Sequence, residues 1–221
     1  TVRSVKVPGG NLVRIAVLGT GNVGRALGCR WAEAGHEVFF GARDPASEEA
    51  IETRARAGSA ELGTCSEAIA ASEAVLLAIP WDQTRGVLEA ADDLDGKILL
   101  DCINPLTSDL LGLELGFDNS AAEQIAQWFP RSRVVKAFNT LSAATMEDAT
   151  YGDQQAAMFY CGDDARAKAT VKQLSEELGF DAIDCGPLRI ARQLEPLAML
   201  YVHLAVFEGW GGDCAFKMLK R

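Results

Sequence analysis

A glycine-rich turn between an apolar run and a helical pattern constrains the fold more than any other part of this sequence. Residues 13–18 form an apolar run rich in β-branched side chains, which predicts a buried strand. The next six positions have the spacing G-x-G-x-x-G and are Gly19, Thr20, Gly21, Asn22, Val23 and Gly24. Apolar side chains then recur at helical spacing over residues 22–34, and Gly35 follows them. The turn therefore joins a strand to a helix.

The glycines of this turn predict dinucleotide binding. Gly19 permits the tight turn, Gly21 lets the main chain approach a pyrophosphate, and Gly24 lets the helix lie close to the strand. Free backbone N–H groups at the start of the helix then face the two phosphates. A glycine-rich turn that binds no ligand is the alternative, and the complete strand–helix–strand context argues against it.

Strands alternate with helices along the rest of the chain. Strand patterns are found at 36–40, 59–62, 74–79, 97–101, 134–138, 156–161 and 180–184. Helical patterns are found at 47–57, 66–71, 82–91, 120–129 and 164–178, and a final helix is expected at 189–208. This alternation predicts an α/β protein with a Rossmann-like, doubly wound and mostly parallel sheet.

We expect two regions without a hinge between them. Residues 11–140 contain the glycine turn and are predicted to form the nucleotide-binding domain. Residues 141–221 are predicted to form a small C-terminal α/β extension that packs on this domain and ends in the final helix.

The end of the second predicted strand bears on which dinucleotide binds. Sites for NAD usually place Asp or Glu there, about 20 residues past the first glycine, to bind the ribose 2′-hydroxyl. Here Ala42 and Arg43 occupy the strand end. Arg43 is suited to stack on adenine and to bind a 2′-phosphate, and Thr20 adds a hydroxyl donor. Pairing of Arg43 with Asp44 or with a surface carboxylate is the alternative, and the sequence favours NADP over NAD.

Residues after three later strands are further candidates for the cofactor site. Ligands bind outside the carboxyl ends of the strands in an open parallel sheet. The candidates at these ends are Ile79, Pro80, Trp81, Asn104, Ala137 and Asn139. Pro80 and Trp81 are expected to wall the nicotinamide pocket, and the two asparagines to supply amide contacts. The alternatives are hydrogen-bonded turn residues for the asparagines and a half-buried loop anchor for Trp81.

The sequence offers no evident proton donor or acceptor for a dehydrogenase reaction, which commonly uses His, Lys or a Tyr/Lys pair. His36 is expected at the amino end of its strand, which is the wrong edge of the sheet, and His203 is expected in the core. Lys136 and Asn139 are expected on opposite faces because side chains alternate along a strand. We therefore assign no catalytic residue. A nicotinamide without such a partner fits direct hydride exchange with a second redox cofactor.

Charge and cysteine content limit the partners and the compartment. Lys and Arg number 21 against 31 Asp and Glu, a net charge of −10 that argues against nucleic acid as a partner. No apolar stretch is long enough to span a membrane, and residues 1–10 lack the apolar run of a secretion signal. The 6 cysteines lie far apart, so we expect buried, reduced thiols, no metal site and a cytoplasmic protein.

Several segments of the chain resemble the F420-dependent NADP reductases. They are residues 17–24, 41–44, 79–81 and 134–140, together with a tail at 194–198 and 211–217. The resemblance runs from about Val13 to the C-terminus. The Lys-Ala-Phe-Asn element at 136–139 and the tail make it more specific than the glycine turn alone.

The resemblance implies NADP(H) across the sheet edge, with the deazaflavin coenzyme F420 stacked on its nicotinamide. In that family a Thr-Gly-Asn-aliphatic loop and a Ser-Arg pair bind the phosphates. Residues 20–23 match the loop and Arg43 matches the arginine, but Ala42 stands where the family has serine. The loss of one hydroxyl donor weakens the preference for NADP and leaves its main cation in place.

The identity of the electron acceptor stays open at this point, because the family is also similar to the cytosolic NADPH domains of membrane ferric reductases. Hydride transfer between NADPH and F420 or a similar planar acceptor is the leading hypothesis. Transfer to a flavin, quinone or ferric chelate is one alternative, and a sensor that binds NADP without turnover is another. The apolar stripe of the final helix and Trp210 also predict a homodimer, unless the stripe packs on its own domain.

Overall fold

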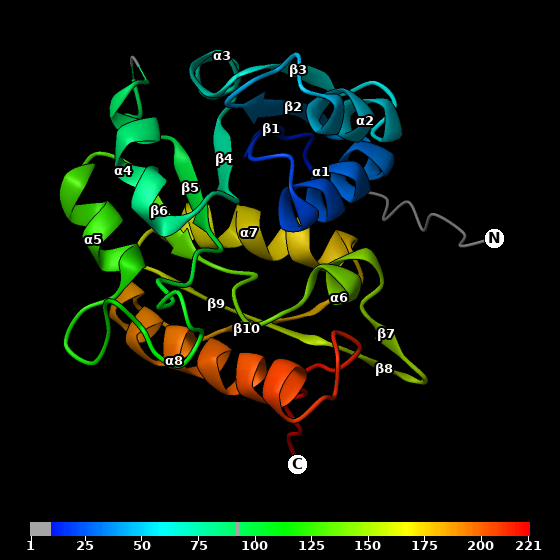
Figure 1. Ribbon diagram of the computed structural model, residues 1–221, viewed down its shortest axis with the longest axis vertical. Coiled ribbons are helices and arrows are strands. Elements are labelled where there is room, and N and C mark those ends of the chain that lie inside the picture. The colour runs from blue at the N-terminus through cyan, green and yellow to red at the C-terminus, as the bar shows by residue number, and fades with distance from the viewer. Residues whose placement is uncertain (1–9, 92) are drawn as a thin grey trace.

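The computed structural model describes residues 10–91 and 93–221, and its centre is a sheet of eight strands (Figure 1). The strands of this sheet are β1 (Arg14–Leu18), β2 (Glu37–Ala42), β3 (Glu61–Thr64), β4 (Ala74–Leu77), β5 (Ile98–Asp101), β6 (Arg133–Lys136), β9 (Ala157–Gly162) and β10 (Asp181–Asp184). Their spatial order is β10-β9-β6-β5-β4-β1-β2-β3. A separate hairpin consists of β7 (Thr150–Tyr151) and β8 (Gln154–Gln155).

Helices cover both faces of the sheet. They are α1 (Asn22–Ala34), α2 (Glu48–Arg56), α3 (Cys65–Ala71), α4 (Trp81–Glu89), α5 (Ala121–Trp128), α6 (Ala143–Glu147), α7 (Ala165–Glu177) and α8 (Ala191–Val202). One apolar core gathers buried side chains of α1, α6 and α7 on one face of the strands. A second core gathers those of α3, α4, α5 and α8 on the other face. The predicted doubly wound α/β architecture is confirmed.

The strand order places a topological switch point beside β1. From β3 to β6 every neighbouring pair is parallel, and the chain runs outward from β1 first through β2 and then through β4. Ligands of open α/β sheets bind at such a point, outside the carboxyl ends of the strands. Beyond β6 the sheet continues with β9, which is antiparallel to β6, and with β10, which is parallel to β9. The predicted C-terminal α/β extension therefore adds strands to the same sheet.

Helix α1, which leads out of the glycine turn, is held firmly on the sheet. A side chain at Gly28 would meet the ring of Phe40 at 2.5 Å, so glycine lets α1 lie close to β2. The indole Nε1 of Trp31 donates to the carbonyl of Leu174 in α7 at 3.1 Å. These contacts fix the direction in which the start of α1 points.

The structure differs from the sequence expectations in three segments. The third strand lies at Glu61–Thr64 instead of 59–62. The stretch 142–153 contains α6 and most of the β7–β8 hairpin, which are too short to show periodicity. The expected final helix is divided into a 3₁₀ turn at Leu188–Ile190 (η1), α8, and a π-helical turn at His203–Phe207 (η2). No helix in the described ranges is long and apolar enough to cross a membrane.

Candidate functional site

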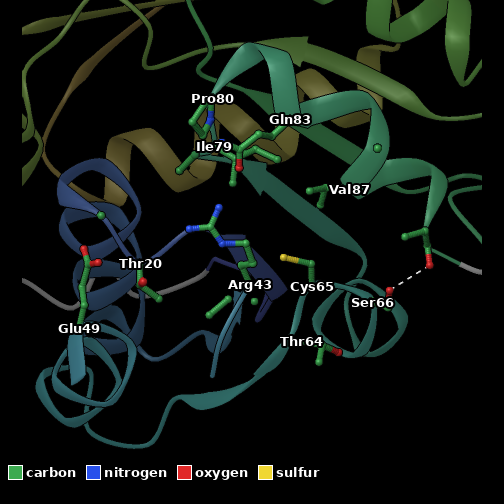
Figure 2. Close-up of a pocket in the computed structure, with 17 residues that line it drawn as sticks. Thr20, Arg43, Glu49, Thr64, Cys65, Ser66, Ile79, Pro80, Gln83 and Val87 are labelled. Carbon is green, nitrogen blue, oxygen red and sulfur yellow. Dashed lines mark hydrogen bonds between the residues drawn. The ribbon is translucent and has the colours of Figure 1, made fainter. Parts of the chain in front are cut away.

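A cavity of about 580 Å³ lies at the carboxyl ends of β1, β2, β3 and β4 (Figure 2). Its walls come from the glycine turn, the end of β2, the first turn of α3 and the β4–α4 connection. The lining residues are Gly19, Thr20, Gly21, Gly41, Ala42, Arg43, Glu49, Thr64, Cys65, Ser66, Ala78, Ile79, Pro80, Gln83, Gly86, Val87 and Ala90. Its size is ordinary for a small-molecule site.

The glycine turn forms the cavity wall at the start of α1. Gly19 has a φ of +102°, which a side chain rarely adopts, and a Cβ on Gly24 would lie 2.0 Å from the carbonyl oxygen of Gly19. Gly21, by contrast, has open space where its Cβ would stand. It also caps α1 without a side-chain hydrogen bond, so the first N–H groups of the helix are available to an anion.

Arg43 projects from the end of β2 into the cavity (Figure 2). Within the described residues it makes no ion pair, and the Oδ1 of Asp44 instead accepts from the backbone N–H of Ala46 at 3.0 Å. The alternative in which Arg43 pairs with Asp44 is therefore wrong. Ala42 is buried beside Arg43 and presents only a methyl group.

The first turn of α3 also lines the cavity, and sequence reasoning missed it. Thr64 ends β3, the strand whose position was expected too early in the chain, and Cys65 and Ser66 begin α3. Their position at the carboxyl end of a parallel strand was the signal that pointed to them. Burial raises the pKa of the Cys65 thiol, so this group stays neutral near pH 7.

The end of β4 contributes Ile79 and Pro80 to the cavity, but Trp81 does not line it. Trp81 begins α4 and stacks on Trp128 of α5, with ring centroids 5.2 Å apart and planes 15° apart. Its indole therefore joins α4 to α5. The other candidates of the first α1 turn, Asn22, Val23 and Gly24, are also absent from the cavity wall.

Asn104 and Asn139 lie together beyond the ends of β5 and β6. The Nδ2 of Asn104 donates to the carbonyl of Asn139 at 2.8 Å, and the Nδ2 of Asn139 donates to the Oδ1 of Asn104 at 3.0 Å. Asn139 also donates to the carbonyl of Leu194 at 2.9 Å. Its own Oδ1 is buried and has no hydrogen-bond partner in the described part of the chain. Ala137 is fully buried, and none of these three candidates lines the cavity.

Three comparisons with known proteins bear on this site. Residues 14–105 match the family model described as NADP oxidoreductase, coenzyme F420-dependent. The F420-dependent NADP reductase of Methanothermobacter marburgensis is 33% identical over 209 residues, which cover 88% of this chain and 93% of that protein. The chain belongs to the F420-dependent NADP reductase family. A solved structure from Arthrobacter sp. FB24, assigned to the same reductases, is 34% identical with a TM-score of 0.85, covering 94% of this chain and 100% of that one.

Two other similar proteins are longer than this chain, which matches only part of each. Metalloreductase STEAP3 of Rattus norvegicus is 32% identical over 189 residues, but these cover 85% of this chain and 37% of that protein. A reductive aminase from Aspergillus terreus has a TM-score of 0.64 at 21% identity, covering 90% of this chain and 64% of that one. At that identity the likeness shows the fold alone.

A buried ionic cluster lies beside the Asn104–Asn139 pair in this reductase-family chain. The Nζ of Lys136 is 2.9 Å from the Oδ2 of Asp101 and 2.7 Å from the Oε1 of Glu195, and all three side chains are fully buried. The Oε2 of Glu195 also accepts from the N–H of Ala121, at the start of α5, at 3.0 Å. Burial lowers the pKa of Lys136, but the two carboxylates outweigh it and the pKa is raised, so the ammonium stays charged.

This cluster overturns the expectation that Lys136 and Asn139 face opposite sides. Both contact α8, Lys136 through Glu195 and Asn139 through the carbonyl of Leu194. The strand ends at Lys136, and Phe138 has a φ of +60°, so the alternation of an extended strand stops before Asn139. Sequence periodicity gives no signal for such a left-handed residue.

The two histidines lie outside the cavity wall. His36 stands before β2, at the amino edge of the sheet as expected, where its Nε2 is 2.6 Å from the Oε2 of Glu177. The expectation of a core histidine at 203 is wrong, because its side chain is 56% exposed and lies 3.3 Å from Glu208. Of the cysteines, Cys161 is buried and the others are half-buried, which corrects the expectation that all six thiols are buried.

Proposed function

We propose that this protein is an NADP(H)-dependent oxidoreductase that transfers hydride between NADPH and coenzyme F420. The observation that carries the proposal is the cavity in which the uncapped start of α1 and the unpaired guanidinium of Arg43 face one space, as far as the described residues show. A helix start with free N–H groups suits a pyrophosphate, and a guanidinium suits a 2′-phosphate. Relatives across nearly the whole chain are named F420-dependent NADP reductases.

The cavity fits the adenosine and pyrophosphate parts of NADP(H). The open space beside Gly21 lets a pyrophosphate approach the backbone, and Arg43 is placed to meet the 2′-phosphate. Cys65 and Val87 supply apolar surface for the adenine ring. Thr20 lines the same cavity, and its hydroxyl can donate a hydrogen bond to the nucleotide.

We assign the nicotinamide to the neighbouring strand ends, past Ile79 and Pro80. Because β4, β5 and β6 lie side by side in parallel register, Asn104 and Asn139 follow the strands next to this edge of the cavity. The Oδ1 of Asn139, which lacks a partner among the described residues, is a suitable acceptor for the carboxamide N–H₂.

The chain's own contribution to the reaction is binding and orientation. NADPH supplies the hydride, and holding its nicotinamide against a planar acceptor supplies much of the catalysis. The ionisable side chains that line the described cavity are Arg43, Glu49 and Cys65, and the thiol stays protonated. We therefore assign no proton transfer to the cavity wall.

The test is anaerobic oxidation of NADPH, beside NADH, with F420, FMN and a ferric chelate as parallel acceptors. We expect rapid loss of the F420 absorbance with NADPH and slow reaction with the other two acceptors. Turnover with FMN or ferric chelate and none with F420 would favour a flavin or ferric reductase, a second candidate that the 32% identity to a metalloreductase supports. Tight NADPH binding without turnover would make the protein a nucleotide sensor and would contradict the proposal.

We further propose a cytoplasmic homodimer that does not bind nucleic acid. The six free cysteines support a reducing compartment. The net charge of −10 opposes binding to a phosphate backbone. Leu200, Phe207 and Trp210 are exposed at the end of α8 and after it, and a second copy would cover them.

A further inference from the structure

Glu49 of α2 lines the same cavity as Arg43, although it lies outside the strand end where NAD sites usually carry their acid. Arg43 is the one cation and Glu49 the one carboxylate among the described residues that line this cavity. The acid that NAD sites carry at the strand end is therefore missing there, but a carboxylate reaches the cavity from the helix that follows.

Helix α2 is attached to the glycine turn in a way that directs Glu49. The Oγ1 of Thr53 donates to the carbonyl of Thr20 at 3.2 Å, and this contact is buried. Glu49 lies four residues before Thr53 and so projects from the same face of α2. Glu49, Thr20 and Arg43 all line the cavity, and in the view of Figure 2 Thr20 appears between Glu49 and Arg43.

The charged side chains of Arg43 and Glu49 suit two different ribose groups. A 2′-phosphate is attracted by Arg43 and repelled by Glu49, and the methyl group of Ala42 gives it no hydroxyl donor. A free ribose 2′-hydroxyl finds a hydrogen-bond acceptor in Glu49 and needs no cation. Glu49 and Ala42 therefore reduce the affinity for NADPH relative to the affinity for NADH.

We propose that Glu49 is a specificity-determining residue that accepts a hydrogen bond from the ribose 2′-hydroxyl of NADH, so that the cavity takes NADH as well as NADPH. This inference rests on the proposed function, since it requires that the cavity hold the nucleotide.

The test compares dissociation constants of NADPH and NADH, measured by nicotinamide fluorescence, for the wild type and three variants. Glu49→Gln removes the repulsion and is expected to tighten NADPH binding about fivefold. Glu49→Ala removes the acceptor as well and is expected to weaken NADH binding by about the same factor. Glu48→Gln is the matched control, because Glu48 is exposed on the same turn and does not line the cavity, and it should change neither constant.

The outcomes separate this inference from the function on which it rests. If the wild type binds NADPH and both Glu49 variants keep its ratio of NADH to NADPH affinity, Glu49 is a solvated helix residue and only this inference fails. An equal change in Glu48→Gln would assign the effect to the general charge of α2 and would also overturn it. If the wild type binds neither nucleotide, the proposed function fails together with it.

Discussion

Arg43 is the residue on which recognition of the 2′-phosphate depends most directly, because no other cation lines the described cavity. We expect Arg43→Ala to weaken NADPH binding by about 2 kcal/mol, or about 30-fold, since it removes a charge-assisted bidentate contact. NADH binding should change far less. Fluorescence titration checks both constants, with Arg85→Ala as control, because Arg85 pairs with Glu89 away from the cavity. Equal losses for the two nucleotides would refute the role of Arg43.

Gly21 and Gly24 are predicted to respond differently to the same added methyl group. Gly24→Ala should destabilise the fold by about 2 kcal/mol or more, because the new Cβ would lie 2.0 Å from the Gly19 carbonyl oxygen. Gly21→Ala should cost less than about 1 kcal/mol, since its φ of −68° suits alanine, but should weaken NADPH binding on the order of tenfold. Urea unfolding and NADPH titration measure the two effects. Normal nucleotide affinity in Gly21→Ala would exclude pyrophosphate from this turn.

Single residues show where sequence reasoning succeeds and where it stops. Gly19, Gly21 and Arg43 were predictable because a local motif assigns each a position relative to a strand and a helix. Glu49 was not, because it reaches the cavity only through the packing of α2. The contact of Lys136 with Glu195 joins residues far apart in the chain and follows no local periodicity.

At the scale of elements, an ion pair between Arg192 and Glu123 joins α8 to α5. The Nε and Nη2 of Arg192 lie 2.8 and 2.7 Å from the two carboxylate oxygens of Glu123, which also accepts from the Oγ of Ser120. Burial raises the pKa of Glu123, but the hydrogen bonds from Arg192 and Ser120 outweigh it, and the pKa lies below its usual value. Folding therefore favours the ionised carboxylate.

This shift gives a pH-dependent prediction for Glu123→Gln. The stabilisation is present above the unfolded pKa of about 4.3 and is lost as the pH falls through the lower pKa of the folded state. We expect the variant to be less stable than the wild type by about 1 kcal/mol at pH 7, a modest value because Arg192 is partly exposed. The difference should shrink as the pH falls below the unfolded pKa. Urea unfolding at pH 7 and at pH 3 measures it, and a difference that does not shrink would contradict the assignment.

Element boundaries were predictable where a pattern was long. The bounds expected for α1 match the structure, since its apolar positions recur over 13 residues. The five residues of α6 begin with a hydrogen bond from the N–H of Thr145 to the Oγ of Ser142, a signal too local to separate a helix from a turn. The π-helical turn at His203–Phe207 likewise leaves no trace in the pattern of apolar residues.

At the scale of the whole molecule, the mostly parallel sheet and the edge that holds the site followed from the alternation of strands and helices. The antiparallel direction of β9 beside β6 could not be predicted, because it depends on the connection between these two strands, which has no regular sequence pattern. The division between residues 140 and 141 stays a prediction.

The proposed homodimer is a property of the whole molecule. Leu200 in α8 and Phe207 in the π-helical turn that follows it are 48% and 47% exposed, and a second copy would cover this apolar surface. We expect a dimer in sedimentation velocity and a monomer for Leu200→Glu. Leu111→Glu, which changes an exposed leucine in the loop after β5, should remain a dimer. A wild type that stays monomeric at high concentration would refute the proposed dimer.

Hydrogen–deuterium exchange with and without saturating NADPH tests the central claim most directly, because it reports where on the chain the nucleotide binds. The account predicts slower exchange in residues 19–24, 41–43, 64–66 and 79–83, which line or adjoin the described cavity. It predicts no change in residues 128–132, which line a second cavity of about 440 Å³. Slower exchange at 128–132 without an effect at 19–24, or no change anywhere, would contradict the assignment of this cavity to NADP(H).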